Sequence, residues 1–315
     1  MKSKRRWLLP LLAVVGVLLG AAVAASWAPD RSVADLGTRW APPPSQFIAL
    51  QGMQVHMRDE GPRDDAEPIV LIHRTSASLH TWEGWVAALT GTCRVIRMDL
   101  PAFGLTGRAA DSDYSIERYV AFVLALMDRL GVRQAVLGGN SLGGEIAWNV
   151  ALSAPARVTR LILVDAAGYP LRAQSVPLGF RLARMPWVNR MMPNLLPRAL
   201  IEASVRNVFG DPGRVTPALV DRYYELTLRE GNRAALPLRF AQIRRDDPSE
   251  RLRGIAVPTL ILWGGRDRLI PSADGAAFAA AIAGSRLVVF DDLGHVPQEE
   301  DARRTVAEVR GFLAR

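Results

Sequence analysis

A serine, an aspartate and a histidine occur in the order and the local settings that nucleophilic attack on a carbonyl carbon requires. Ser141 is the centre of the pentapeptide Gly139-Asn140-Ser141-Leu142-Gly143, which has the form G-x-S-x-G. An apolar run over 135–138 precedes it and a helical pattern over 145–152 follows. A sharp turn between a strand and a helix exposes a serine hydroxyl above the edge of a sheet and points the N–H groups of the helix at it. The pattern predicts a nucleophile elbow.

A serine hydroxyl needs a base to take its proton, and the base needs an acid to orient it and balance its charge. Of the four histidines, His295 follows the last predicted strand, so it lies at the same sheet edge as Ser141. Two aspartates also end strands and point to this edge, namely Asp165 and Asp267. The order serine, acid, histidine is kept with either of them.

The elements that position these residues alternate between strands and helices. Buried strands are predicted over 69–73, 94–100, 135–138, 160–165, 258–264 and 286–290, after an antiparallel pair over 47–50 and 54–58. Helices are predicted over 81–89, 115–130, 145–152 and 301–313. Nearly continuous apolar strands alternating with helices indicate an α/β fold with a mostly parallel, doubly wound sheet.

The alternation of strands and helices stops at residue 168 and resumes at residue 257. With the N-terminal segment and the tether, the chain therefore has four parts. Residues 46–168 and 257–315 form the core, and 169–256 form a helical cap with its clearest helices over 195–208 and 216–230. The apolar side chains early in the cap are candidates for lining a substrate pocket: Phe180, Leu182, Met185, Trp187, Val188, Met191 and Met192. Residues 29–45, which end in three prolines, are expected to be an extended tether.

Residues 1–28 have the form of an anchoring or export segment. A basic start, Lys2 to Arg6, leads into 22 uncharged residues, which as a helix extend about 33 Å. We expect an uncleaved membrane anchor with the catalytic domain on the periplasmic side of the inner membrane. Cleavage after Ala22-Val23-Ala24 would make the protein a secreted one.

Three motifs in order give the chain from about Phe47 to its end a resemblance to the α/β-hydrolases that carry a cap. They are the elbow, the stretch Gly264-Gly265-Arg266-Asp267 with Pro271, and Gly294-His295 with Pro297 and Glu300. The resemblance implies that Asp267, rather than Asp165, is the acid of a Ser141–Asp267–His295 triad. It also implies that the N–H groups of Leu142 and Thr75 form the oxyanion hole.

The oxyanion loop departs from the pattern of this family, which usually has His-Gly where this chain has His73-Arg74. If the position needs the conformational freedom of glycine, an arginine there is strained by roughly 1–3 kcal/mol. The guanidinium also brings a positive charge to the oxyanion. We hypothesise that Arg74 either impairs the hole or favours acidic substrates.

The function expected from these features is hydrolysis of small to medium carboxylic esters through an acyl-enzyme on Ser141, with no cofactor and no metal. Two alternatives share the triad, a hydrolase of carbon–carbon bonds in ring-cleavage products and a cofactor-free haloperoxidase. A third alternative is a ligand-binding protein without catalysis. The net charge of +8 is spread in scattered arginines once the four basic residues of the start are set aside, so a nucleic-acid partner is not expected. The sequence identifies neither the substrate-binding residues nor the oligomeric state.

Overall fold

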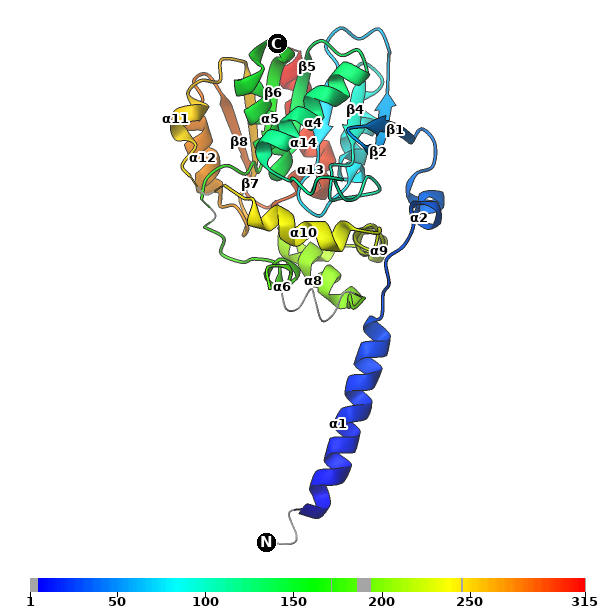
Figure 1. Cartoon of the computed structure of the whole chain (residues 1–315). Coiled ribbons are helices and arrows are strands. Elements are labelled where there is room, and N and C mark those ends of the chain that lie inside the picture. Colours follow the sequence, from blue (N-terminus) through cyan, green and yellow to red (C-terminus); the bar gives the residue numbers. More distant parts are fainter. Residues whose placement is uncertain (1–4, 171, 186–193, 245, 315) are drawn as a thin grey trace.

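The computed structural model describes residues 5–170, 172–185, 194–244 and 246–314, and an eight-stranded sheet lies at its centre (Figure 1). The strand order is β1-β2-β4-β3-β5-β6-β7-β8. The strands are β1 (Gln46–Leu50), β2 (Met53–Glu60), β3 (Ile69–Ile72), β4 (Val95–Met98), β5 (Ala135–Asn140), β6 (Val158–Val164), β7 (Thr259–Gly264) and β8 (Arg286–Phe290). Only the pairs β1–β2 and β2–β4 are antiparallel among the described strands. The predicted mostly parallel sheet is confirmed.

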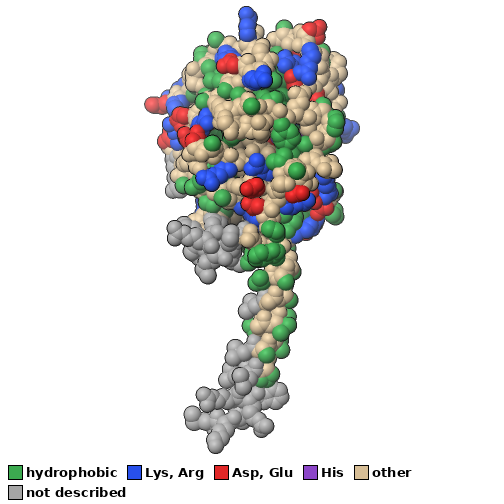
Figure 2. All heavy atoms as spheres, turned by 45° about the vertical axis from the view of Figure 1, so that its right-hand side comes forward, with side chains coloured by type: hydrophobic (Ala, Val, Ile, Leu, Met, Phe, Trp, Pro, Cys, Tyr) green, Lys and Arg blue, Asp and Glu red, His purple; other side chains and the backbone are tan. Residues whose placement is uncertain are grey.

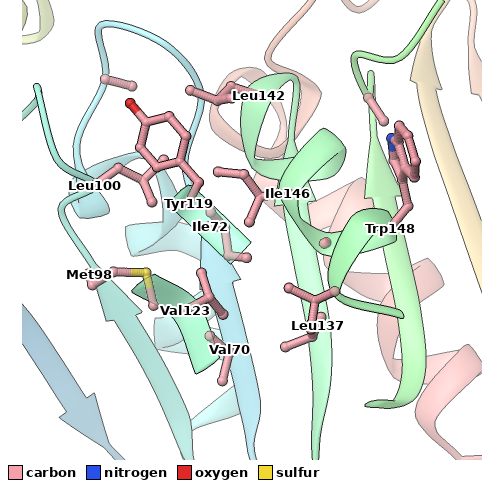
Figure 3. Close-up of a cluster of buried hydrophobic side chains, with 14 of the residues drawn as sticks. Val70, Ile72, Met98, Leu100, Tyr119, Val123, Leu137, Leu142, Ile146 and Trp148 are labelled. Carbon is pink, nitrogen blue, oxygen red and sulfur yellow. The ribbon is translucent and has the colours of Figure 1, made fainter. Parts of the chain in front are cut away.

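Helices cover both faces of the sheet, because successive side chains of each strand point to opposite sides. Val70 and Ile72 pack on one face, in the cluster under α4 and α5 that Figure 3 shows, whereas Ile69 and Leu71 pack on the other face. The helices of the core are α3 (Glu83–Leu89), α4 (Ile116–Arg129), α5 (Leu142–Ser153), α12 (Ser272–Ala281), α13 (Pro297–Glu300) and α14 (Ala302–Leu313). Short 3₁₀ turns occupy Leu79–Trp82, Pro155–Arg157 and Pro212–Arg214.

The cap follows β6, and its described helices are α6 (Leu178–Ala183), α8 (Arg198–Val208), α9 (Pro217–Thr227), α10 (Asn232–Ala241) and α11 (Ser249–Leu252). Helices α6, α8, α9 and α10 gather at one end of the sheet, whereas α11 lies beside α12 (Figure 1). Thr216 caps α9, since its hydroxyl accepts a hydrogen bond from the N–H of Leu219 at 3.2 Å. Four predicted pocket residues, Trp187, Val188, Met191 and Met192, lie outside the described residues.

Residues 29–45, the predicted tether, contain a helix and are not extended throughout. Helix α2 (Val33–Trp40) begins with a capping box in which Ser32 and Asp35 bond each other's backbone N–H groups. Leu36 is fully buried in a cluster with Leu105 and Leu226, and the indole of Trp40 donates to Glu225 at 2.6 Å. The segment is therefore packed between the core and the cap.

The predicted helix of the N-terminal segment is present as α1 (Arg5–Ser26), which projects away from the core and the cap (Figure 1). Figure 2 shows hydrophobic and uncharged side chains on its described surface, whereas charges of both signs are mixed over the globular part. No helix in the described part of the chain is long and apolar enough to cross a bilayer. The prediction of a membrane-spanning anchor over 1–28 is therefore not confirmed.

Candidate active site

The turn between β5 and α5 has the geometry of a nucleophile elbow. Ser141 has φ 55° and ψ −114°, a conformation that non-glycine residues rarely adopt. The surrounding backbone leaves no room for side chains at Gly139 and Gly143, the two glycines of the motif. A Cβ on Gly139 would lie 2.1 Å from the carbonyl oxygen of Gly143, and one on Gly143 would lie 2.0 Å from that of Ile72. The two glycines of the motif allow the start of α5 to press against β3 and β5 beneath the serine.

The structure brings His295 and Asp267 together. The Nδ1 atom of His295 lies 2.6 Å from Oδ2 of Asp267, and both side chains are buried. The other oxygen, Oδ1, accepts hydrogen bonds from the N–H groups of Leu269 and Ile270 at 2.7 and 2.9 Å. A carboxylate can only accept hydrogen bonds, so Nδ1 of His295 must carry the ring proton. The lone pair of the neutral imidazole is then on Nε2.

That Nε2 atom is buried and has no hydrogen-bond partner within the described chain. The hydrogen bond from the Ser141 hydroxyl to Nε2 is not closed here, as is common in sites without substrate. The side chain of Asn140, next to Ser141, nonetheless ties the two loops together, because its Nδ2 donates to the carbonyl oxygen of His295 at 3.0 Å. The arrangement leaves one imidazole nitrogen available as a base beside the elbow.

The three other histidines have structural roles, since both ring nitrogens of each are hydrogen-bonded. Burial lowers the pKa of His73, and burial also lowers the pKa of His80 to about 3. Their partners are Asp99 and Ser45 for His56, Arg74 and Leu100 for His73, and Ser78 and Trp40 for His80. Among the four histidines, His295 therefore has the ring nitrogen that is free to accept a proton.

Asp165, the alternative acid, lies beside the pair but does not bond His295. It has φ 42° and is fully buried, and its Oδ1 accepts from the N–H of Gly264 at 2.9 Å. Its Oδ2 has no hydrogen-bond partner in the described residues. Burial, and then the negative charge of Asp267, raise the pKa of Asp165 well above its ordinary value. The environment of Asp165 therefore favours its neutral form, whereas Asp267 is the aspartate that contacts His295.

Asp165, Asp267 and His295 offer ligand-type atoms that lie within 4.8 Å of one another, which is the spacing of a possible metal site. Their contacts do not suit a cation. Nδ1 of His295 already contacts Asp267, and burial raises the pKa of Asp165, which favours its neutral form. The donor set fits a proton-handling group better than a metal-binding one.

The predicted oxyanion donors lie at the two loops expected. The main-chain N–H groups of Leu142 and Thr75 make no hydrogen bond within the described chain, so both are free for a ligand. The hypothesis that Arg74 strains its loop is wrong, because the left-handed φ, 55°, belongs to Ser76 and not to Arg74. An arginine fits this position without backbone strain.

Residues to which the sequence analysis assigned no role hold the histidine loop in place. The N–H of His295 donates to the carbonyl of Val208, the last residue of α8, at 2.8 Å. The carboxylate of Glu300 accepts from the N–H groups of Gly294, Gly210 and Asp211 at 2.8, 2.9 and 2.8 Å. Glu300 is the last residue of the third motif, and this place in the motif was the only sign in the sequence of its role. The base is therefore held by backbone groups of the cap.

A cavity of about 880 Å³ lies between the cap and the loop that follows β3. Phe180 and Leu182 line it, as predicted, whereas Met185 does not. Its wall includes Arg74 and Ser76, on either side of Thr75, but not Ser141 or His295. The cavity reaches the oxyanion loop, and the serine lies beyond that wall.

Residues 67–302 match the family model described as the alpha/beta hydrolase fold, so the chain belongs to this family of hydrolases. It is 29% identical to 2-hydroxymuconate semialdehyde hydrolase of Pseudomonas sp. strain CF600, over 85% of this chain and 93% of that protein. It is also 29% identical to 2-hydroxy-6-oxo-2,4-heptadienoate hydrolase of Pseudomonas putida, with coverages of 85% and 96%.

Solved structures give the same result. A meta-cleavage product hydrolase from Pseudomonas fluorescens has a TM-score of 0.73 at 25% identity, covering 85% of this chain and 97% of that one. The enol-lactonase of Burkholderia xenovorans has a TM-score of 0.72 at 27% identity, with coverages of 85% and 100%. The fold and the hydrolase class predicted from the sequence are confirmed, whereas the ester specificity is not.

Proposed function

We propose that the chain is a serine hydrolase that cleaves the bond between a carbonyl carbon and a neighbouring carbon, in substrates of the ring-cleavage type. The observation that carries the catalytic part is the 2.6 Å contact of His295 with Asp267, beside an elbow serine and with Nε2 left free. The two relatives named for substrates of this type, which match over most of both chains, support the choice of bond.

In this proposal the Ser141 hydroxyl attacks the carbonyl carbon while Nε2 of His295 takes its proton. The N–H groups of Leu142 and Thr75 stabilise the negative oxygen that forms. Asp267 keeps Nδ1 protonated and balances the charge of the imidazolium. The carbon–carbon bond then breaks, and the departing carbon receives the proton from His295. Water, activated by the same imidazole, releases the acyl group from Ser141 as a carboxylic acid.

A second candidate is the hydrolysis of carboxylic esters or lactones by the same steps, with an alcohol as the leaving group. Carbon–carbon hydrolases usually have an oxyanion loop rich in glycine and proline, but this chain has Arg74-Thr75-Ser76-Ala77-Ser78 there. The likeness to an enol-lactonase, which by its name acts on a cyclic ester, also favours this candidate.

One experiment separates these functions. The full chain and a Ser141→Ala control are assayed with 2-hydroxy-6-oxo-2,4-heptadienoate and with a series of p-nitrophenyl esters. We expect turnover of the dienoate that the control lacks. Faster turnover of the esters would favour the second candidate. If neither substrate is turned over and a fluorophosphonate does not label Ser141, both candidate functions are refuted. The ligand-binding alternative then remains.

Export of the domain belongs to the same proposal and is supported by the basic start and the uncharged stretch of the sequence. Cell fractionation and N-terminal sequencing of the recovered protein test it. Activity found only in the cytoplasmic fraction would contradict export.

A further inference from the structure

The cavity under the cap is mostly apolar, but three arginines lie in its wall, Arg74, Arg222 and Arg233. Two of them have an acidic partner, since Arg222 pairs with Glu299 and Arg233 pairs with Asp30. Arg74 has no carboxylate partner in the described part of the chain. It is the cavity arginine whose charge the protein leaves uncompensated.

Arg74 is only 4% exposed, so little of its charged group reaches solvent. Its Nη1 donates to the carbonyl of Thr75 at 3.0 Å, and its guanidinium lies 5.2 Å from the centre of the Tyr223 ring. Its Nε–H is buried and bonds nothing within the described chain. A buried guanidinium with an unused donor is costly unless an anion completes its surroundings.

We infer that Arg74 binds the carboxylate of a substrate whose remaining part is apolar and fills the cavity. The planar fork of a guanidinium matches a carboxylate in geometry as well as in charge. The position also fits the chemistry, because Arg74 immediately precedes Thr75, whose N–H is the proposed oxyanion donor. The carboxylate then lies a few atoms from the carbonyl that Ser141 attacks. The inference rests on the proposed function and adds to it the residue that selects acidic substrates.

Binding without turnover tests this inference separately from the reaction. The full chain with Ser141→Ala is titrated calorimetrically at neutral pH with 4-phenylbutanoate and with 4-phenylbutanamide, which have the same shape but differ in charge. We expect the acid to bind about 10- to 100-fold more tightly than the amide, the range of a charge-assisted hydrogen bond. Equal affinities, or no binding of the acid, would overturn the inference even without any further variant.

Variants then assign the preference to a residue. Arg74→Gln, added to Ser141→Ala, is expected to abolish the preference for the acid, and Arg74→Lys to retain part of it, since the lysine keeps the charge but not the fork. Arg233→Gln is the matched control, because that cavity arginine already has Asp30 as a partner. A preference that survives Arg74→Gln, or one that is lost in Arg233→Gln, would place the carboxylate elsewhere. Circular dichroism of each variant shows that it is folded.

If the enzyme cleaves esters and not carbon–carbon bonds, these binding results stay the same. In active enzyme the same preference is measured as the ratio of kcat/KM for p-nitrophenyl hydrogen glutarate to that for p-nitrophenyl pentanoate. Arg74→Gln is expected to lower the ratio about tenfold or more. An unchanged ratio would contradict the inference.

Discussion

Replacing Asp267 by asparagine changes one atom and tests how the base is oriented. The carboxylate oxygen Oδ1 accepts two backbone hydrogen bonds, from Leu269 and Ile270 at 2.7 and 2.9 Å. In the Asp267→Asn variant the carbonyl oxygen must stay at this position, because an amide NH₂ there would face two donors. The NH₂ group therefore takes the place of Oδ2, 2.6 Å from Nδ1 of His295.

A donor at this place requires Nδ1 of His295 to become the acceptor, so the proton moves to Nε2. The nitrogen that faces Ser141 then carries a hydrogen and cannot take the serine proton. The same exchange in a Ser-His-Asp triad lowers kcat by about 10⁴-fold, which corresponds to about 5 kcal/mol of transition-state stabilisation. We expect a loss of this size here, with the fold intact.

The assay is kcat of the full chain on its best substrate, with Asp165→Asn as the matched control. Burial raises the pKa of Asp165 and so favours its neutral form, and an asparagine there can still accept from the N–H of Gly264 through its carbonyl oxygen. Its kcat should therefore change only slightly. The reasoning fails if Asp267→Asn loses less than about tenfold, or if Asp165→Asn loses as much as Asp267→Asn.

Three further predictions follow from the same contacts. Gly143→Ala places a methyl group 2.0 Å from the carbonyl oxygen of Ile72, so urea unfolding should show a loss of about 3 kcal/mol or more, and an unchanged midpoint would contradict the close approach. Glu300→Gln sets an amide donor against backbone N–H groups, which should lower the free energy of unfolding by about 1–3 kcal/mol. The His295 loop then loosens, so kcat should fall as well. Urea unfolding and kinetics measure the two effects, and a variant as stable and active as the unaltered chain would refute the role of Glu300. The folded pKa of Asp165 is raised above its unfolded value, so its contribution is present at low pH and is lost as the pH rises towards the folded pKa. The free energy of unfolding of Asp165→Asn relative to the unaltered chain should therefore increase between pH 5 and pH 8, and a flat or falling difference would show that Asp165 is ionised.

The strands were predictable from sequence because those of a doubly covered sheet are apolar along most of their length, as 69–72 and 260–263 are. The helices α2, α6, α10, α11, α12 and α13 escaped prediction, and local reasons explain three of them. Helix α2 is short and precedes three prolines, α10 contains Pro237, and α12 is rich in alanine and shows no amphipathic period. Their stability comes from the surfaces on which they pack, which the local pattern does not contain.

The sequence motifs predicted the residues of the candidate site, but not the contacts that hold these residues in place. Ser141, Asp267 and His295 each follow a strand, so the shared sheet edge implies that they meet. The fit of Arg74 depends on which residue of its loop has the positive φ, and this is Ser76. The contacts of Asn140 and Glu300 join segments far apart in the chain, and no spacing rule reports them. Contacts of this kind are set by tertiary packing alone.

The bonds from Val208 and Gly210 to the histidine loop restrict how the chain can be recombined. An exchange of the cap with a relative that cuts at 169 and 256 separates these backbone groups from residues 291–300, which contact them in this chain. A chimaera should keep its catalytic competence only when both segments come from the same parent. In an evolving lineage the substrate-shaping part and the base therefore form one inherited module, although about 80 residues of sequence lie between them.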